Sequence, residues 1–80
     1  MILHVDKKNA PYVLTKPLHP SQTVLKEDET GLVIRIDVVL NFELEREILG
    51  FGESVKMLAP KLLVSRVQRR LKTAMWRYEK

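Results

Sequence analysis

The sequence predicts an α+β fold of the ferredoxin-like type, a βαββαβ sandwich in which helices cover an antiparallel sheet. Three observations lead to this prediction. Apolar residues alternate along residues 32–40, an acidic segment ending in glycine has the composition of a hairpin turn, and two later segments carry apolar residues at helical spacing. We expect the first helix to be short or irregular and the C-terminal helix to be long.

The first part of the chain is interrupted by prolines. Residues 2–6 are predicted to form a short strand that ends before Pro11, because proline lacks a backbone N–H and restricts the residue before it. Residues 12–15 are compatible with one helical turn. Residues 21–26 then favour an edge strand, and residues 27–31 form the acidic turn that ends in glycine.

A central strand over residues 32–40 is the clearest expected element. Alternate residues are apolar and mostly β-branched, which is typical of a strand with one buried face. The opposite face carries Arg35 and Asp37 at its centre, so that it either is solvated or contacts another domain. The inward positions are Leu32, Ile34, Ile36, Val38 and Leu40.

A helix is expected directly after this strand, with Asn41 as a favourable N-cap. Three glutamates fall in its opening turns, where the helix dipole favours carboxylates, and we expect them to be solvated. They are Glu43, Glu45 and Glu47. Apolar residues at helical spacing form one stripe, and two glycines end the helix. These are Leu44, Ile48 and Phe51 for the stripe, and Gly50 and Gly52 for the end.

Residues 55–58 are expected to form a short strand that Pro60 stops. The last helix is predicted to begin at Pro60 or Lys61 and to run to about Tyr78. Its apolar residues lie in one sector of a helical wheel, so we expect an amphipathic helix laid on the sheet. This sector contains Leu63, Val64, Val67, Leu71, Ala74, Met75 and Tyr78.

With 80 residues, the chain is expected to form one domain, residues 1–80, with a small core. Small domains usually gain stability from disulfides, a metal or a partner chain. The absence of cysteine excludes disulfides and cysteine-based sites, and two histidines far apart are too few for a zinc site. Oligomerisation or docking against another domain is therefore the expected supplement.

Membrane, secretory and enzymatic functions are not expected. The apolar runs are too short to span a bilayer, and the N-terminus lacks the basic start and apolar stretch of a secretion signal. We therefore expect a cytoplasmic protein without a membrane partner. No nucleophile–base arrangement is visible, and Gly50-Phe51-Gly52 is too short for a phosphate loop. We predict no catalytic residues, no metal site and no cofactor.

The positive charge is concentrated at the end of the chain. Residues 1–30 carry a net charge of 0, residues 31–60 carry −2 and residues 61–80 carry +6, which sum to +4. A basic helix attracts nucleic acid or an acidic protein surface, although many basic helix faces are only solvated. Trp76 either stacks on a base or packs at a dimer or interdomain interface. The candidate contacts are Arg66, Arg69, Arg70, Lys72, Trp76 and Arg77.

A second group of candidates surrounds Pro17 and Pro20. The prolines fix the backbone and leave polar side chains beside it. These side chains either satisfy local backbone groups in a rigid turn or form the wall of an effector pocket or an interdomain contact. The candidates are His19, Ser21, Gln22 and, from the outward face of the central strand, Arg35.

Several segments, taken in order, resemble the C-terminal extension (WCX) domain of WYL-domain-containing bacterial transcriptional regulators. The resemblance covers roughly residues 10–78, which is nearly all of the chain. The segments that carry it are Pro17-Leu18-His19-Pro20-Ser21-Gln22, Asn41-Phe42-Glu43-Leu44, Ile48-Leu49-Gly50-Phe51-Gly52, Val55-Lys56-Met57-Leu58-Ala59-Pro60 and a final helix that ends in Tyr78.

This resemblance implies a longer parent protein, with an upstream helix-turn-helix DNA-binding domain and a central WYL domain as partners of this fragment. In such regulators the extension is associated with dimerisation and with sensing of nucleic acid or a small ligand. Our leading hypothesis is therefore a non-catalytic regulatory module that forms a homodimer and helps effector sensing. The alternative is nucleic-acid binding by the basic C-terminal helix, and a small-molecule-binding domain is a third hypothesis.

Overall fold

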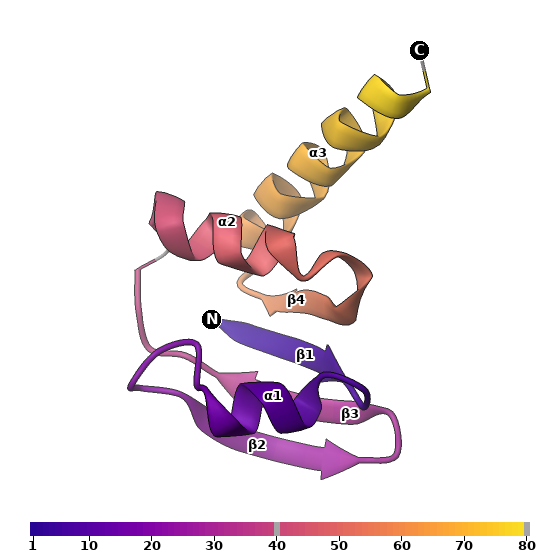
Figure 1. Ribbon diagram of the computed structural model, residues 1–80. Helices are drawn as coiled ribbons and strands as arrows, with labels where there is room; N and C mark the ends of the chain where they lie inside the picture. The colour runs from indigo at the N-terminus through magenta and orange to yellow at the C-terminus, as the bar shows by residue number, and fades with distance from the viewer. Residues whose placement is uncertain (40, 80) are drawn as a thin grey trace.

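The computed structural model describes residues 1–39 and 41–79. Within these residues, a βαββαβ unit is continued by one long helix (Figure 1). In chain order the elements are β1 (Ile2–Asp6), α1 (Ala10–Thr15), β2 (Thr23–Asp28), β3 (Gly31–Arg35), α2 (Phe42–Gly50), a 3-10 turn (Gly52–Ser54), β4 (Val55–Ala59) and α3 (Lys61–Tyr78).

The four strands form one sheet in the order β2-β3-β1-β4, and every neighbouring pair is antiparallel. Helices α1 and α2 lie over one face of this sheet (Figure 1). This strand order with helices on one face is that of a ferredoxin-like α+β sandwich, so the predicted fold class is confirmed.

The core lies between the sheet and these helices. In the register of β1 and β3, Leu3 is opposite Ile34 and Val5 is opposite Leu32, so that these side chains share the inward face. All four are fully buried. The buried residues that complete the core are Ala10, Val13, Ile36, Leu44, Ile48, Val55, Met57 and Val67.

The central strand is shorter than predicted. It ends at Arg35, which pairs with Ile2 at the start of β1. Beyond this point β1 offers no further partner, so the chain leaves the sheet, although the Ile36 N–H still donates to the Met1 carbonyl at 2.8 Å. The predicted strand over residues 36–39 is therefore wrong, and Leu40 lies outside the described residues.

The predicted edge strand and hairpin turn are both present, but the strand covers Thr23–Asp28 rather than residues 21–26, so the turn is confined to Glu29 and Thr30. Strand β2 is exposed along its whole length at one edge of the sheet, and the turn between it and β3 returns the chain at Gly31. Gly31 has a φ of 141°, and a Cβ here would collide with the carbonyl oxygen of Val5, so only glycine fits. Hydrogen bonds from Thr30 to the Asp28 carboxylate lower the pKa of Asp28 to about 2.

Helix α2 begins as the sequence predicts. The side chain of Asn41 accepts a hydrogen bond from the Leu44 N–H at 2.8 Å, which is the expected N-cap contact. The helix ends at Gly50, and Gly52 follows with a φ of 59°. One of its glutamates, Glu45, is not solvated but fully buried, which contradicts the prediction for the opening turns.

Helix α3 has the predicted bounds, but only its first half lies against the sheet. Leu63 and Val64 are half-buried and Val67 is buried, whereas Leu71 is 45% exposed. Figure 1 shows α3 leaving the body of the fold towards its C-terminal end. The reason is length, because 18 residues of helix extend about 27 Å whereas the five residues of β4 extend only about 17 Å.

Candidate functional site

A buried carboxylate joins α2 to α3. Glu45 is 0% exposed, and two arginines one turn apart on α3 converge on it. Nη2 of Arg66 lies 3.0 Å from Oε2, Nε of Arg66 donates to Oε1 at 3.3 Å, and Nη1 of Arg70 lies 3.0 Å from Oε1. We call this arrangement the Glu45 ion-pair cluster. It fixes the position of α3 relative to α2.

The charge on Glu45 is maintained by these two arginines. Burial raises the pKa of a carboxyl group, but the hydrogen bond and positive charge of Arg70 and the charge of Arg66 outweigh this effect, so the pKa of Glu45 lies below its ordinary value of 4.5. The carboxylate is therefore ionised in the folded protein at neutral pH.

The basic residues of α3 consequently divide into two groups. Arg66 and Arg70 are committed to Glu45, and both remain only partly accessible. Arg69, Lys72 and Arg77 are exposed and form no salt bridge with any residue in the described ranges. The second group is the part of the predicted basic surface that is open to an external anion.

The exposed end of α3 also carries large apolar side chains. Leu71, Met75 and Tyr78 are 45%, 59% and 92% exposed. They are four and three residues apart and therefore share one side of the helix. We call them the exposed apolar stripe. Trp76 is 53% exposed and lies beside the stripe among the basic residues.

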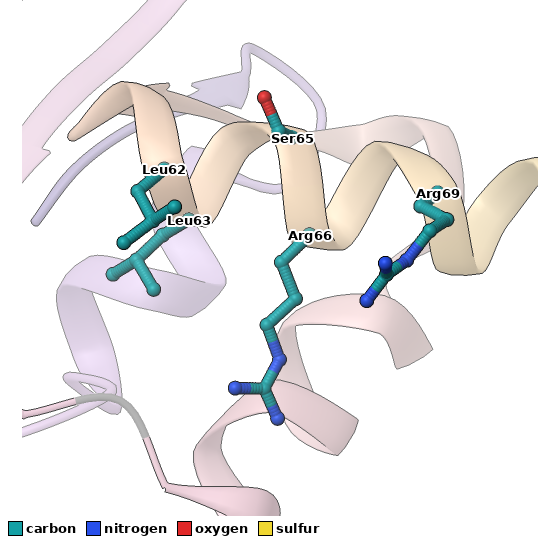
Figure 2. A pocket seen from close by; sticks show the side chains of 5 residues that line it. All are labelled: Leu62, Leu63, Ser65, Arg66 and Arg69. Atoms are coloured by element: carbon teal, nitrogen blue, oxygen red, sulfur yellow. The ribbon is translucent and has the colours of Figure 1, made fainter.

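A hollow of about 400 Å³ opens along the first half of α3 (Figure 2). Figure 2 shows Arg66 and Arg69 extending from the same side of the helix, with Ser65 further round it. Leucine side chains provide the apolar part of the lining, so the hollow combines apolar surface with the open guanidinium of Arg69, beside that of Arg66, which also binds Glu45. Such a lining suits an anionic group attached to an apolar body. The hollow is lined by Leu62, Leu63, Ser65, Arg66 and Arg69.

The candidate residues beside Pro17 and Pro20 form a local hydrogen-bond network. The Ser21 N–H donates to His19 Nδ1 at 3.1 Å, and Ser21 Oγ lies 2.8 Å from the same nitrogen. Gln22 accepts from the Leu18 N–H and donates to the Val13 carbonyl. The structure thus brings His19, Ser21 and Gln22 together, and their hydrogen bonds join this turn to α1 as well.

Arg35 is connected to this network only indirectly. Its Nε donates to Asp37 at 2.8 Å, and the Asp37 N–H donates to Ser21 Oγ at 2.9 Å. Arg35 and Asp37 are both largely exposed, so the pair contributes little to stability. Hydrogen bonds among Arg35, Asp37 and Ser21 connect the segment before β2 to the segment after β3.

Glu45 is the functional residue that the sequence reasoning missed. A signal was present, because Glu45 lies between Leu44 and Leu49 on a helical wheel, at the margin of the apolar stripe. In residues 1–39 and 41–79, no three histidines or carboxylates gather into a metal site. No helix in this part of the chain is long and apolar enough to cross a membrane.

Comparison with protein families finds a match over most of the chain. The model of the WCX domain matches residues 1–75. The chain belongs to the WCX domain family. WCX is a regulator-associated domain and not a known enzyme family, and the match supports a regulatory-type module of WYL regulators. No curated protein matches the chain.

The Glu45 ion-pair cluster makes a prediction for the stability of this WCX domain. Replacing both arginines, Arg66→Met with Arg70→Met, leaves a buried carboxylate without a partner. We expect a loss of about 2 kcal/mol, which is less than the roughly 3–5 kcal/mol for a fully buried pair because the guanidinium groups are half-exposed. Adding Glu45→Leu removes the buried charge and is expected to restore most of the loss. Urea unfolding at pH 7 measures all three proteins, and a double variant as stable as the parent would contradict the prediction.

The lowered pKa of Glu45 makes a second prediction. A carboxyl group with a lowered folded-state pKa contributes stability that is fully present above its ordinary value of 4.5 and is lost as the pH falls through the lowered value. The advantage of the parent over Glu45→Gln should therefore be constant near neutral pH and shrink below pH 4.5. Urea unfolding of both proteins between pH 7 and 3 tests this, because the other carboxylates titrate in both. A difference that does not change with pH would refute it.

Proposed function

We propose that this WCX domain is a non-catalytic regulatory and dimerisation module of a WYL-type helix-turn-helix transcriptional regulator. In this proposal residues 1–80 form one domain of a longer cytoplasmic protein, whose helix-turn-helix and WYL domains are its partners within the chain. Two copies associate as a homodimer, and the domain helps the regulator to sense its effector.

The observation that carries the dimerisation proposal is the exposed apolar stripe. Leu71, Met75 and Tyr78 continue the row that Val64 and Val67 begin on the buried part of α3, but their exposure rises along the helix from 45% to 92%. Burial of apolar area contributes about 25 cal/mol per Å², so three large side chains offer a substantial gain to a partner. A domain of this size has a small core and benefits from such a partner.

The Glu45 ion-pair cluster supports the same proposal. It holds the first half of α3 against α2, so the second half extends in one defined direction. A helix presented in this way loses little further freedom on association, which lowers the cost of forming a dimer. In a two-fold arrangement, each stripe would pack against that of the other copy.

Self-association is tested with single charges placed in the stripe. Leu71→Asp or Met75→Asp puts a charge into the dimer interface and is expected to weaken association at least about tenfold, since an unpaired buried charge costs more than 1.4 kcal/mol. Val39→Asp is the matched control, because Val39 is an 86% exposed apolar residue outside α3. Sedimentation equilibrium over a range of concentrations measures the dissociation constant, and a parent that stays monomeric at high concentration would overturn the dimer.

A second candidate function, nucleic-acid binding, is favoured by the three open cations of α3. Arg69, Lys72 and Arg77 are free to contact phosphates, and the exposed ring of Trp76 lies among them, where it could stack on a base. This candidate rests on three cations and one aromatic ring and has no apolar partner for the stripe. It therefore explains less of α3 than dimerisation does.

The two candidates respond to salt in opposite directions. Phosphate contacts weaken steeply as salt increases, whereas a dimer that brings two basic helices together should become tighter because salt screens their repulsion. We expect little binding of single-stranded or duplex oligonucleotides at 0.15 M salt and tighter dimers at 0.5 M.

Arg69→Glu with Lys72→Glu is the informative charge reversal, because reversing Arg70 would also break the Glu45 ion-pair cluster. Tight oligonucleotide binding that this variant abolishes would favour the second function.

A further inference from the structure

A second hollow lies between α1 and α2, away from the surface of α3. Its volume is about 360 Å³, which is within the range of sites for small ligands. Glu47 lies about 200° around α2 from Glu45, so the hollow occupies the opposite side of that helix from the ion-pair cluster. It is lined by Asn9, Tyr12, Glu47, Gly50 and Phe51.

Two aromatic rings form the apolar part of this α1–α2 hollow. The rings of Tyr12 and Phe51 pack edge to face, with their centroids 6.4 Å apart and their planes at 64°. Tyr12 is 55% exposed and Phe51 is half-buried, so ring surface is accessible to a ligand. The negative face of an aromatic ring attracts a positive group placed over it.

The polar part of the lining comes from Asn9, Glu47 and the hydroxyl of Tyr12, and it includes no cationic side chain. Both N–H bonds of the Asn9 amide are engaged, donating to Asp6 at 3.0 Å and to Ser54 at 2.9 Å, so only its carbonyl oxygen is available. The exposed carboxylate of Glu47 accepts hydrogen bonds and has no salt-bridge partner within residues 1–39 and 41–79. Gly50 has no side chain that would narrow the opening.

We propose that the α1–α2 hollow binds a guanidinium or alkylammonium group. Such a group is cationic, donates several hydrogen bonds and stacks on aromatic rings, which matches a lining of ring surface, one carboxylate and one amide oxygen. An anion would meet the carboxylate of Glu47, and the lining holds no cationic side chain to offset the repulsion. This assignment gives a chemical class to the effector sensing in the proposed function and rests on that part of it, but it does not depend on dimerisation.

The group can reach the hollow from two sources that share this chemistry. It is either part of a free amine or guanidine, or the basic side chain of a polypeptide. The exposed end of α3 in a second copy of this chain is one polypeptide segment that carries such side chains. Agmatine, which carries both cationic groups on a short chain, is a probe for the first source. A peptide of residues 68–79 of this chain is a probe for the second.

The experiment is an NMR titration of the ¹⁵N-labelled domain with agmatine. We expect saturable shifts of the backbone amides of Asn9, Gly50 and Phe51, whereas n-butylurea, a neutral analogue, should cause none. Glu47→Gln and Tyr12→Leu should each weaken agmatine binding about threefold to tenfold. Glu43→Gln is the matched control, because it removes the same charge one turn earlier on α2 but outside the lining. Its affinity should stay within about twofold of the parent.

The outcomes separate the alternatives. Equal losses in Glu43→Gln and Glu47→Gln, saturation by n-butylurea, or no saturable shift with agmatine or the peptide would each overturn the site. Shifts of the same amides by the peptide, in competition with agmatine, assign the group to a protein side chain, and shifts by agmatine alone assign it to a free amine. Because dimerisation is read from sedimentation of the Leu71→Asp variant, failure of this site and failure of the dimer are distinguishable.

Discussion

The placement of the C-terminal helix depends on one buried charge. Moving a carboxylate out of water costs several kcal/mol, and Glu45 is tolerated in the interior because Arg66 and Arg70 surround it. Apolar packing alone holds α3 weakly, since Val67, at 8% exposure, is its one buried residue within the described chain. The direction in which the exposed half of α3 extends is therefore determined mainly by electrostatics between two helices.

The two halves of α3 therefore have different functions. Its first half is a structural part of the WCX domain, in which two of the basic residues neutralise a carboxylate of the same chain. Its second half presents an apolar stripe with cations beside it, and the side chains of that stripe are 45% to 92% exposed. A purely solvated helix would not carry Leu71, Met75 and Tyr78 on one side, which is why association explains this half better than charge alone.

The sequence was sufficient for features that depend on neighbouring residues. Alternation over residues 32–35, the Asn41 cap and the apolar spacing of α3 are local signals, and each is found where it was predicted. The end of β3 was not predictable in this way, because it depends on where β1 begins. The burial of Glu45 and the departure of α3 from the sheet likewise depend on how α2, β4 and α3 meet. Such tertiary constraints produce only weak patterns in a single sequence.

The two sides of α2 use the same chemistry in different ways. On one side the carboxylate of Glu45 receives guanidinium groups from its own chain, and on the other side Glu47 and the rings of Tyr12 and Phe51 face outwards. A cation bound beside Glu47 would contact the same nine-residue helix that orients α3. A helix is only about 10 Å across, so a small rotation of α2 would move both sites together. Binding would influence α3 only if the hollow held the cation more tightly in one position of α2 than in another. The affinity of the hollow and the geometry of the dimer would then be linked, each changing the other by the same free energy.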